Sequence, residues 1–124
     1  MPASNESLEM YLENLHVLSL EKDVVRPVDL AHKMGFSKPT ITEWVAKLRE
    51  GGYVEPDAGL GLRLTQKGLD VAQKVYERHV VLCELLCMLG VSPETAEEDA
   101  CRIEHYISDE TFARMKDYCA KLKA

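Results

Sequence analysis

The segment 101–105 carries three side chains that bind transition metals in proteins. Cys101, Glu104 and His105 supply a thiol, a carboxylate and an imidazole. If the segment is helical, their i, i+3, i+4 spacing places them on one face of the helix. Carboxylate and imidazole suit Fe, Mn, Zn or Ni, whereas a thiolate favours softer ions. The segment therefore predicts part of a transition-metal site; the alternative is a buried cysteine with Glu104 and His105 at a solvated helix edge.

Composition limits the class of protein that could carry such a site. The chain has 124 residues, of which 46% are hydrophobic and 29% charged, values typical of one soluble globular domain or two small lobes. The first residues show neither a basic stretch nor an apolar run, so we expect no signal peptide and no membrane partner. The four cysteines then indicate reduced thiols of a cytoplasmic protein rather than a disulfide framework.

Turn residues divide the chain into helical patterns and one hairpin. Apolar spacing and caps predict a mostly α fold, in which a winged helix-turn-helix with a small two-stranded wing precedes a helical region. The hairpin surrounds the turn-forming segment 56–59. The predicted helices cover about 5–21, 27–34, 38–48 and 66–89, one that starts at 93 and includes 101–105, and one that starts near 109; the predicted strands cover 53–55 and 60–64.

A winged helix-turn-helix indicates double-stranded DNA as the partner, although the net charge of -6 argues against nucleic acid. Within 37–49, the basic residues Lys38, Lys47 and Arg49 accompany a single acid, Glu43. Arg63, in the predicted wing, is expected to add positive charge to the same DNA-binding surface. The start of this predicted recognition helix would reach base edges. The alternative is a winged helix that docks a protein. The residues predicted to contact DNA are Arg26, Ser37, Lys38, Pro39, Thr40, Thr42, Glu43 and Lys47.

Several short motifs occur in order along the chain, at 9–12, 37–40, 64–68, 78–79, 98–105 and 108–110. Together they resemble the diphtheria-toxin-repressor family, the iron- and manganese-dependent transcriptional repressors of bacteria. The resemblance implies a DNA-binding domain at 1–70, a helical metal-binding and dimerisation domain at 71–124, and a homodimer on a pseudo-palindromic operator. Bound metal would act as corepressor for metal-homeostasis genes. The barrel-like third domain of many members is expected to be absent, as in the shorter manganese-sensing members.

The resemblance also implies a ligand set. One metal would be held by Met10 together with Cys101, Glu104 and His105, so that helix one is clamped to the sensor helix. The pair Met10 and Cys101 resembles the iron-type members, whereas manganese-type members carry carboxylates at both positions. Because sulfur donors favour Fe(II), Co(II), Ni(II) or Zn(II), we expect Fe(II) in the cell and leave Mn(II) open.

A second site implied by the resemblance has a less regular ligand set. His79 matches a ligand of both branches of the family, and Glu13 matches a manganese-branch ligand. The usual carboxylate one turn after His79 is here Cys83, and Glu97 stands where iron-type members have a histidine. The partners of His79 stay open among Glu13, Cys83 and Glu97.

Two other classes of function compete with a metal-dependent regulator. A thiol-redox regulator would use Cys101 or Cys83 as sensor and needs an exposed cysteine with a lowered pKa. A small metal-dependent hydrolase would need a general base beside an open coordination position. No such base and no nucleophile motif is evident, so we expect that the protein is not an enzyme.

Overall fold

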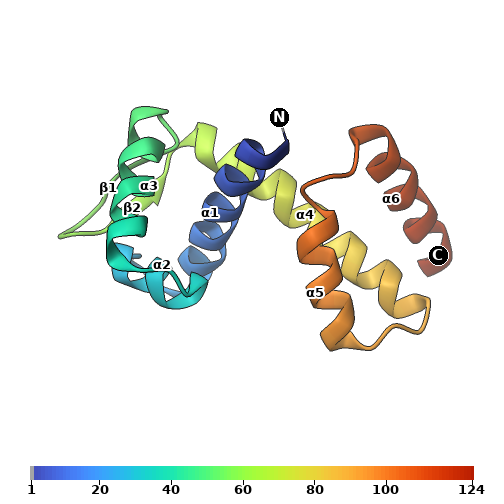
Figure 1. Cartoon of the computed structure of the whole chain (residues 1–124). Coiled ribbons are helices and arrows are strands. Elements are labelled where there is room, and N and C mark those ends of the chain that lie inside the picture. The colour runs from blue at the N-terminus through green and yellow to red at the C-terminus, as the bar shows by residue number, and fades with distance from the viewer. Residues whose placement is uncertain (1) are drawn as a thin grey trace. The chain divides into compact units, whose positions relative to one another are not determined.

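The computed structural model describes the backbone from Pro2 to Ala124 and the side chains from Glu6 onward. Three helices precede a two-stranded antiparallel sheet, and three more helices follow it, which confirms the predicted fold class (Figure 1). The elements are α1 (Pro2–Glu21), α2 (Pro27–Met34), α3 (Lys38–Glu50), β1 (Val54–Pro56), β2 (Leu62–Leu64), α4 (Gln66–Met88), α5 (Pro93–Ile103) and α6 (Asp109–Lys123).

Serine caps begin three of these helices. Ser37, Ser92 and Ser108 each accept a hydrogen bond from the backbone N–H three residues later, which satisfies one of the free donors of a helix start. Gly35 ends α2 with a φ of 70°, in the left-handed region that glycine adopts without strain. The turn between α2 and α3 is therefore set by local sequence, and it fixes where the recognition helix starts.

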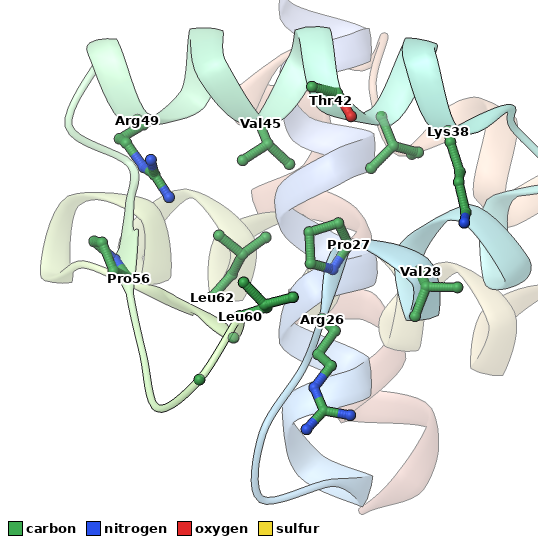
Figure 2. Close-up of a pocket in the computed structure, with 13 residues that line it drawn as sticks. Arg26, Pro27, Val28, Lys38, Thr42, Val45, Arg49, Pro56, Leu60 and Leu62 are labelled. Atoms are coloured by element: carbon green, nitrogen blue, oxygen red, sulfur yellow. The ribbon is translucent and has the colours of Figure 1, made fainter.

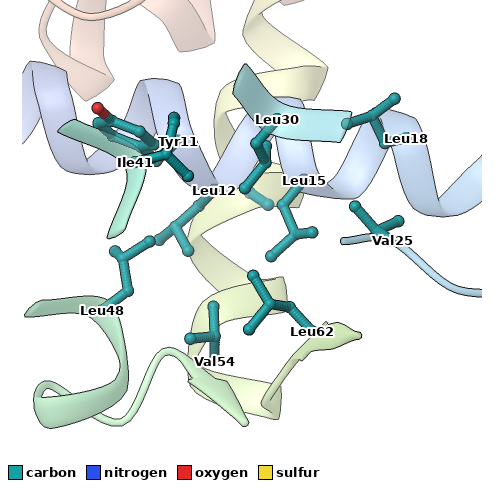
Figure 3. Close-up of a cluster of buried hydrophobic side chains, with 11 residues drawn as sticks. Tyr11, Leu12, Leu15, Leu18, Val25, Leu30, Ile41, Leu48, Val54 and Leu62 are labelled. Atoms are coloured by element: carbon teal, nitrogen blue, oxygen red, sulfur yellow. The ribbon is translucent and has the colours of Figure 1, made fainter. Parts of the chain in front are cut away.

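Residues 7–73 form one compact unit around an apolar core. Figure 3 shows side chains of α1, α2, α3 and the hairpin meeting in this cluster. Leu12, Leu30, Ile41 and Leu48 are at most 1% exposed. The hairpin joins the core through Leu62, whose N–H donates to the carbonyl of Val25 at 2.7 Å. The core thus holds the recognition helix and the wing on one scaffold.

The start of α1 and residues 74–124 form the second compact unit. Its buried apolar residues, Leu82, Ala96, Ala100 and Phe112 among them, come from α4, α5 and α6. Buried polar residues accompany them, because Arg78 is 8% exposed and Glu104 only 1%. A buried charged group is costly unless it is paired, so the partners of these two residues matter for function.

The segment 101–105 is not helical throughout, which corrects the prediction. α5 ends at Ile103, and the chain turns through residues 104–106. The buried Arg78 donates from Nη1 to the carbonyls of Glu104 at 3.3 Å and Ile107 at 2.7 Å. The carbonyls of Glu104 and Ile107 therefore have a partner outside the helix. Cys101 lies within α5, Glu104 is its C-cap residue, and His105 lies in the turn that follows.

In the part of the chain that the structure describes, no helix combines the length and the apolar character that crossing a bilayer requires.

Candidate metal centre and nucleic-acid interface

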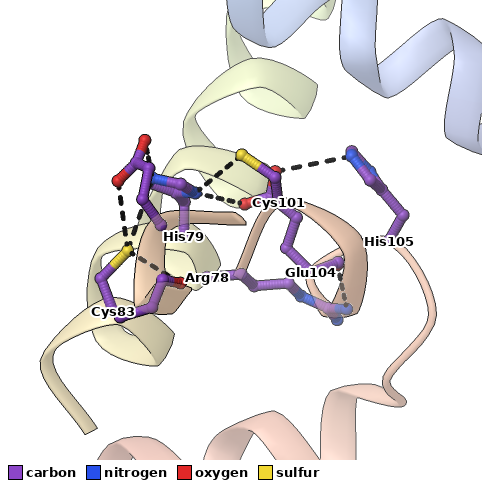
Figure 4. Close-up of polar contacts among 8 residues, drawn as sticks. Arg78, His79, Cys83, Cys101, Glu104 and His105 are labelled. Carbon is purple, nitrogen blue, oxygen red and sulfur yellow. Dashed lines mark hydrogen bonds and ion pairs between the residues drawn. The ribbon is translucent and has the colours of Figure 1, made fainter. Parts of the chain in front are cut away.

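His79, on α4, lies between two groups of side chains, one with Cys101 and Glu104 and the other with Cys83 (Figure 4). Its Nδ1 is 3.0 Å from Oε2 of Glu104 and 3.8 Å from Sγ of Cys101. The ligand atoms of these three residues all lie within 4.8 Å of one another. A thiol, a carboxylate and an imidazole therefore converge from two helices on a volume that one ion could fill. This first group, His79, Cys101 and Glu104, is called the Cys101 cluster.

The environment of Glu104 suits a cation. Its carboxylate is 1% exposed, and among the described residues its Oε1 makes no hydrogen bond. Nε2 of His105 lies 3.5 Å from this Oε1. A buried carboxylate oxygen without a hydrogen bond is destabilising, and a metal ion would supply the missing partner. Together with the thiol and imidazole donors, this oxygen indicates that the residues fit a divalent transition metal.

The other two residues of the Cys101 cluster change the pKa of the His79 imidazole. Cys101 and Glu104 raise the pKa of His79 to about 12, although burial opposes the shift. In the absence of a metal the imidazole therefore holds a proton, which balances the carboxylate. A histidine binds a metal only in its neutral form, so metal and proton compete for this position.

The other face of His79 meets a second group, here called the Cys83 cluster. Nε2 lies 3.0 Å from Oε1 of Glu97 and 3.6 Å from Sγ of Cys83. The Cys83 thiol donates to Oε2 of Glu97 at 3.5 Å. Burial, together with Glu97, raises the pKa of Cys83 to about 11, although His79 opposes the shift. The cluster therefore brings His79 together with two of the three partners that the sequence left open.

The remaining predicted ligands are placed differently. His105 lies beyond the end of α5, next to the second oxygen of Glu104. Met10 and Glu13 lie on α1, in the unit formed by residues 7–73. Their coordination of a metal stays a prediction. Sequence reasoning assigned His79 to a second site only and missed its contact with Cys101 and Glu104, because the 22-residue separation carries no local signal.

A groove of about 430 Å³ runs between α3 and the hairpin, within residues 7–73. Figure 2 shows Arg26, Lys38 and Arg49 around it, with Thr42 on α3 and Leu60 on the hairpin. Of the residues predicted to contact DNA, Arg26, Lys38 and Thr42 line this groove. Ser37, Pro39, Thr40, Glu43 and Lys47 are exposed on or next to α3 without lining it.

Arg49 and Leu60 are among the groove residues that the predicted set of DNA contacts omitted. Arg49 lies in the last turn of α3, whereas the prediction concentrated on the start of that helix. Leu60 is 81% exposed at the tip of the hairpin. Arg63 was expected to add charge to this face, but its Nε donates to Glu55 at 2.8 Å. Among the described residues, the basic side chains that line the groove are therefore Arg26, Lys38 and Arg49, whereas Arg63 of the wing is paired with Glu55.

An aromatic contact fixes the recognition helix on α1. The rings of Tyr11 and Trp44 stack with centroids 4.7 Å apart, and Nζ of Lys47 lies 4.7 Å from the centroid of the Trp44 ring. Offset aromatic pairs and a cation over a ring each stabilise such a contact. The Trp44 ring therefore helps to hold the ammonium group of Lys47 in place.

Two family models together match nearly the whole chain. Residues 5–62 match the iron dependent repressor N-terminal DNA binding domain, and residues 65–124 match the iron dependent repressor metal binding and dimerisation domain. The chain belongs to the iron-dependent repressor family. The resemblance inferred from the sequence motifs is thereby confirmed.

Relatives of this iron-dependent repressor chain carry names of the same kind. It is 32% identical over 121 residues to an HTH-type transcriptional regulator of Methanocaldococcus jannaschii, covering 96% of this chain and 97% of the relative. It is 37% identical over 106 residues to the transcriptional regulator MntR of Salmonella typhimurium, covering 86% of this chain and 68% of the relative.

Solved structures of relatives share the fold. A manganese-dependent transcriptional repressor in complex with manganese superposes with a TM-score of 0.83 at 28% identity, over 91% of this chain and 52% of that one. The manganese regulator SloR gives a TM-score of 0.77 at 29% identity, over 90% of this chain and 52% of that one. The iron-dependent repressor chain therefore spans about half the length of these solved relatives.

Family membership also bears on the competing functions. The family is one of transcriptional repressors and not of enzymes. A redox regulator built on Cys83 would need a lowered thiol pKa, and the pKa of Cys83 is raised. Nothing in the relatives supports the thiol-redox alternative.

Proposed function

We propose that this iron-dependent repressor chain is a transcriptional regulator whose affinity for double-stranded DNA is raised by a divalent transition metal in the Cys101 cluster. The observation that carries the proposal is the convergence of His79, Cys101 and Glu104 around a buried carboxylate oxygen that makes no hydrogen bond in the described part of the chain. Family membership supports both the DNA-binding and the metal-binding halves.

Each residue of the cluster has a distinct role. Glu104 supplies a fixed negative charge that is excluded from water. Cys101 supplies the thiolate, and His79 releases its proton so that the neutral imidazole can bind. A bound divalent ion supplies the positive charge that offsets the carboxylate and the thiolate. His105 and Met10 are proposed as further ligands, as the family resemblance implies.

We propose Fe(II) as the natural metal, with Mn(II) as its competitor. The names of the relatives favour manganese. The donors of this chain favour iron, because a thiolate binds Fe(II) in preference to the harder Mn(II). Native mass spectrometry after anaerobic mixing with equal amounts of both ions decides between them. Predominant loading with Mn(II) would reject the iron assignment and leave the regulator in place.

The Cys83 cluster is proposed as a second, weaker site. His79, Cys83 and Glu97 offer three ligand atoms within 4.8 Å. Glu97 is exposed, and the raised pKa of Cys83 means that a metal must displace a firmly held thiol proton. We therefore expect this site to fill only after the Cys101 cluster.

The DNA partner is proposed to lie over α3 and the groove. Arg26, Lys38 and Arg49 would contact phosphates, which fix the position of the protein on the duplex. Thr42 and Glu43, on exposed positions of α3, would face base edges. A glutamate accepts hydrogen bonds only, so Glu43 would select cytosine through its amino group.

A homodimer would give the two recognition helices that a pseudo-palindromic operator needs. The matched C-terminal model describes a dimerisation domain. Exposed apolar side chains at the end of α4 and on α6 are proposed to be covered by the second copy, which sedimentation analysis of the metal-bound chain tests. These side chains are Met88, Leu89, Tyr118 and Leu122.

The decisive experiment measures DNA affinity with and without metal. A duplex is first selected from a pool of random duplexes with the Fe(II)-loaded chain under anaerobic conditions. Its affinity is then measured by fluorescence anisotropy in chelator and in excess Fe(II) or Mn(II). We expect a gain of about a hundredfold, which corresponds to about 2.7 kcal/mol of coupling. Equal affinity in chelator and metal would reject the proposal.

Matched cysteine variants localise the effect. Cys101→Ala should abolish the gain, because it removes a ligand. Cys87→Ala, an exposed cysteine on α4, should leave the gain unchanged. A full metal response in Cys101→Ala would remove Cys101 from the site.

A further inference from the structure

We propose that Arg78 is a positioning residue of the metal centre. Arg78 and His79 are consecutive on α4, and both contact Glu104. Arg78 binds the main-chain carbonyl of Glu104, while His79 faces its carboxylate. The main chain and the carboxylate of Glu104 are therefore each held by one of two neighbouring residues of α4. The inference rests on the proposed function, because it assigns a role toward the same metal centre.

The contacts of Arg78 concentrate on the segment that follows α5. Nη1 donates to the carbonyls of Glu104 at 3.3 Å and Ile107 at 2.7 Å, and Nη2 donates to the carboxylate of Asp109. A planar guanidinium can bridge such separate acceptors, whereas a lysine ammonium cannot match the geometry. Arg78 thus contacts three acceptors of residues 104–109, of which the Asp109 carboxylate also pairs with Nζ of Lys74 at 3.3 Å.

The position of Glu104 at the end of α5 explains why its contact with Arg78 affects Glu104 as a metal ligand. Glu104 follows the last helical residue of α5, where carbonyl groups have no partner within the helix. Without an external donor such an end frays readily. Arg78 supplies that donor from a buried position, since its side chain is 9% exposed. The carboxylate of Glu104 is then held in place by the main chain as well as by its own contact with His79.

Arg78 is not needed merely to attach α6 to α4. Lys116 donates to Glu77 at 2.5 Å, and Lys123 donates to Glu84 at 3.1 Å, so two other ion pairs link the same helices. Phe112 adds an apolar contact, with its ring 5.4 Å from the guanidinium carbon of Arg78. These pairs do not duplicate the contacts of Arg78 with the carbonyls of Glu104 and Ile107.

The test is a Co(II) titration followed by the thiolate-to-cobalt charge-transfer band and the d–d bands. Arg78→Gln should weaken Co(II) binding at least tenfold and change the d–d bands, since groups that orient metal ligands typically contribute tenfold to a hundredfold in affinity. The matched control is Arg102→Gln, an exposed arginine of α5 that pairs with Asp99 at 3.7 Å. The control should keep wild-type affinity and bands.

Circular dichroism and thermal unfolding in chelator establish that each variant is folded at the titration temperature. Arg78→Gln with the affinity and bands of the wild type would overturn the proposal. If Arg78→Gln does not fold, Arg78→Lys decides, because it keeps the charge and loses the bridging geometry. Weakened Co(II) binding by folded Arg78→Lys supports the proposal, and wild-type binding overturns it. A wild-type chain that takes up no Co(II) would overturn the proposed function together with this inference, whereas normal uptake by the wild type isolates the role of Arg78.

Discussion

The two compact units bury different kinds of side chain. In residues 7–73 the largest fully buried residues are aliphatic, with Leu12, Leu30 and Leu48 at most 1% exposed. In residues 74–124 the buried residues include an arginine and a glutamate, Arg78 and Glu104. The first unit is stabilised by removing apolar surface from water, which requires no ligand. The second holds a buried charge whose partners are incomplete in the described residues, as expected for a unit that responds to a cation.

This difference suggests separate roles for the two units: residues 7–73 as a structural scaffold and residues 74–124 as the proposed metal sensor. A core of leucines keeps the recognition helix and the wing in place at any metal concentration. A carboxylate, a thiol and an imidazole change their protonation and charge when an ion arrives. The comparison therefore predicts that substitutions in the first unit change stability independently of metal, and that substitutions in the Cys101 cluster change mainly the response to metal.

The largest effect is expected in the apolar core. Leu12→Ala should lower the free energy of unfolding by about 2–5 kcal/mol, because it removes buried methyl groups and leaves a cavity. The loss should be the same in chelator and in metal when measured by urea denaturation. A loss that appears only in the presence of metal would contradict the division between scaffold and sensor.

The second-largest effect is expected on the stabilisation of the chain by metal bound in the Cys101 cluster. Metal at about one hundred times its dissociation constant should stabilise the wild-type chain by about 2.7 kcal/mol. Glu104→Gln should lose this stabilisation, because an amide does not supply the carboxylate charge. Thermal unfolding with and without Mn(II) or Co(II) measures the difference. Glu110→Gln, at an exposed position in the first turn of α6, serves as the control and should keep the full stabilisation.

The pH dependence sharpens the comparison within the sensor. His79 has a folded-state pKa raised to about 12, so its contribution to apo stability is complete below about 6.5 and is lost as the pH rises toward 12. Metal affinity should show the opposite slope, rising about a hundredfold per pH unit near neutrality, because one proton leaves His79 and one leaves the Cys101 thiol on binding. Calorimetric titration with Mn(II) in buffers of different pH measures the slope. His79→Gln should reduce the slope to about tenfold per pH unit, and an unchanged slope in this variant would remove His79 from the site.

The smallest effect is expected on the DNA face. Arg49→Ala should weaken DNA binding by about tenfold and reduce the slope of log affinity against log salt by about one, as for the loss of one phosphate contact. Arg63→Ala should have less effect, since Arg63 is paired with Glu55 at 2.8 Å. Anisotropy titrations of the selected duplex at several salt concentrations measure both slopes. Equal losses would show that the wing carries as much phosphate contact as the recognition helix.

Much of the fold could be predicted from local sequence. The short helix before Gly35, the serine caps at Ser37, Ser92 and Ser108, and the hairpin all follow from neighbouring residues, and the structure contains them. Helix ends were less accurate: α1 begins at Pro2 rather than near residue 5, and α3 continues to Glu50 rather than to Leu48. Such ends depend on weak local preferences.

The candidate site was predicted less completely, for a physical reason. The spacing of Cys101 and Glu104 indicated a shared face, which both residues use toward His79. The sequence prediction missed the end of α5 before His105 and the contact of Arg78 with the carbonyl of Glu104, two residues that lie 26 positions apart in the sequence. Contacts over such separations leave no periodic signal. The same applies to the pairing of Arg63 with Glu55, which removed an expected DNA-binding charge.

The most direct test of the account is the position of the metal itself. Crystals of the chain grown with Fe(II) or Co(II) should give an anomalous-scattering peak about 2.0–2.4 Å from both Sγ of Cys101 and a carboxylate oxygen of Glu104, the usual range for such ligands. A crystal that contains the metal but shows its peak away from Cys101 and Glu104 would contradict the central claim.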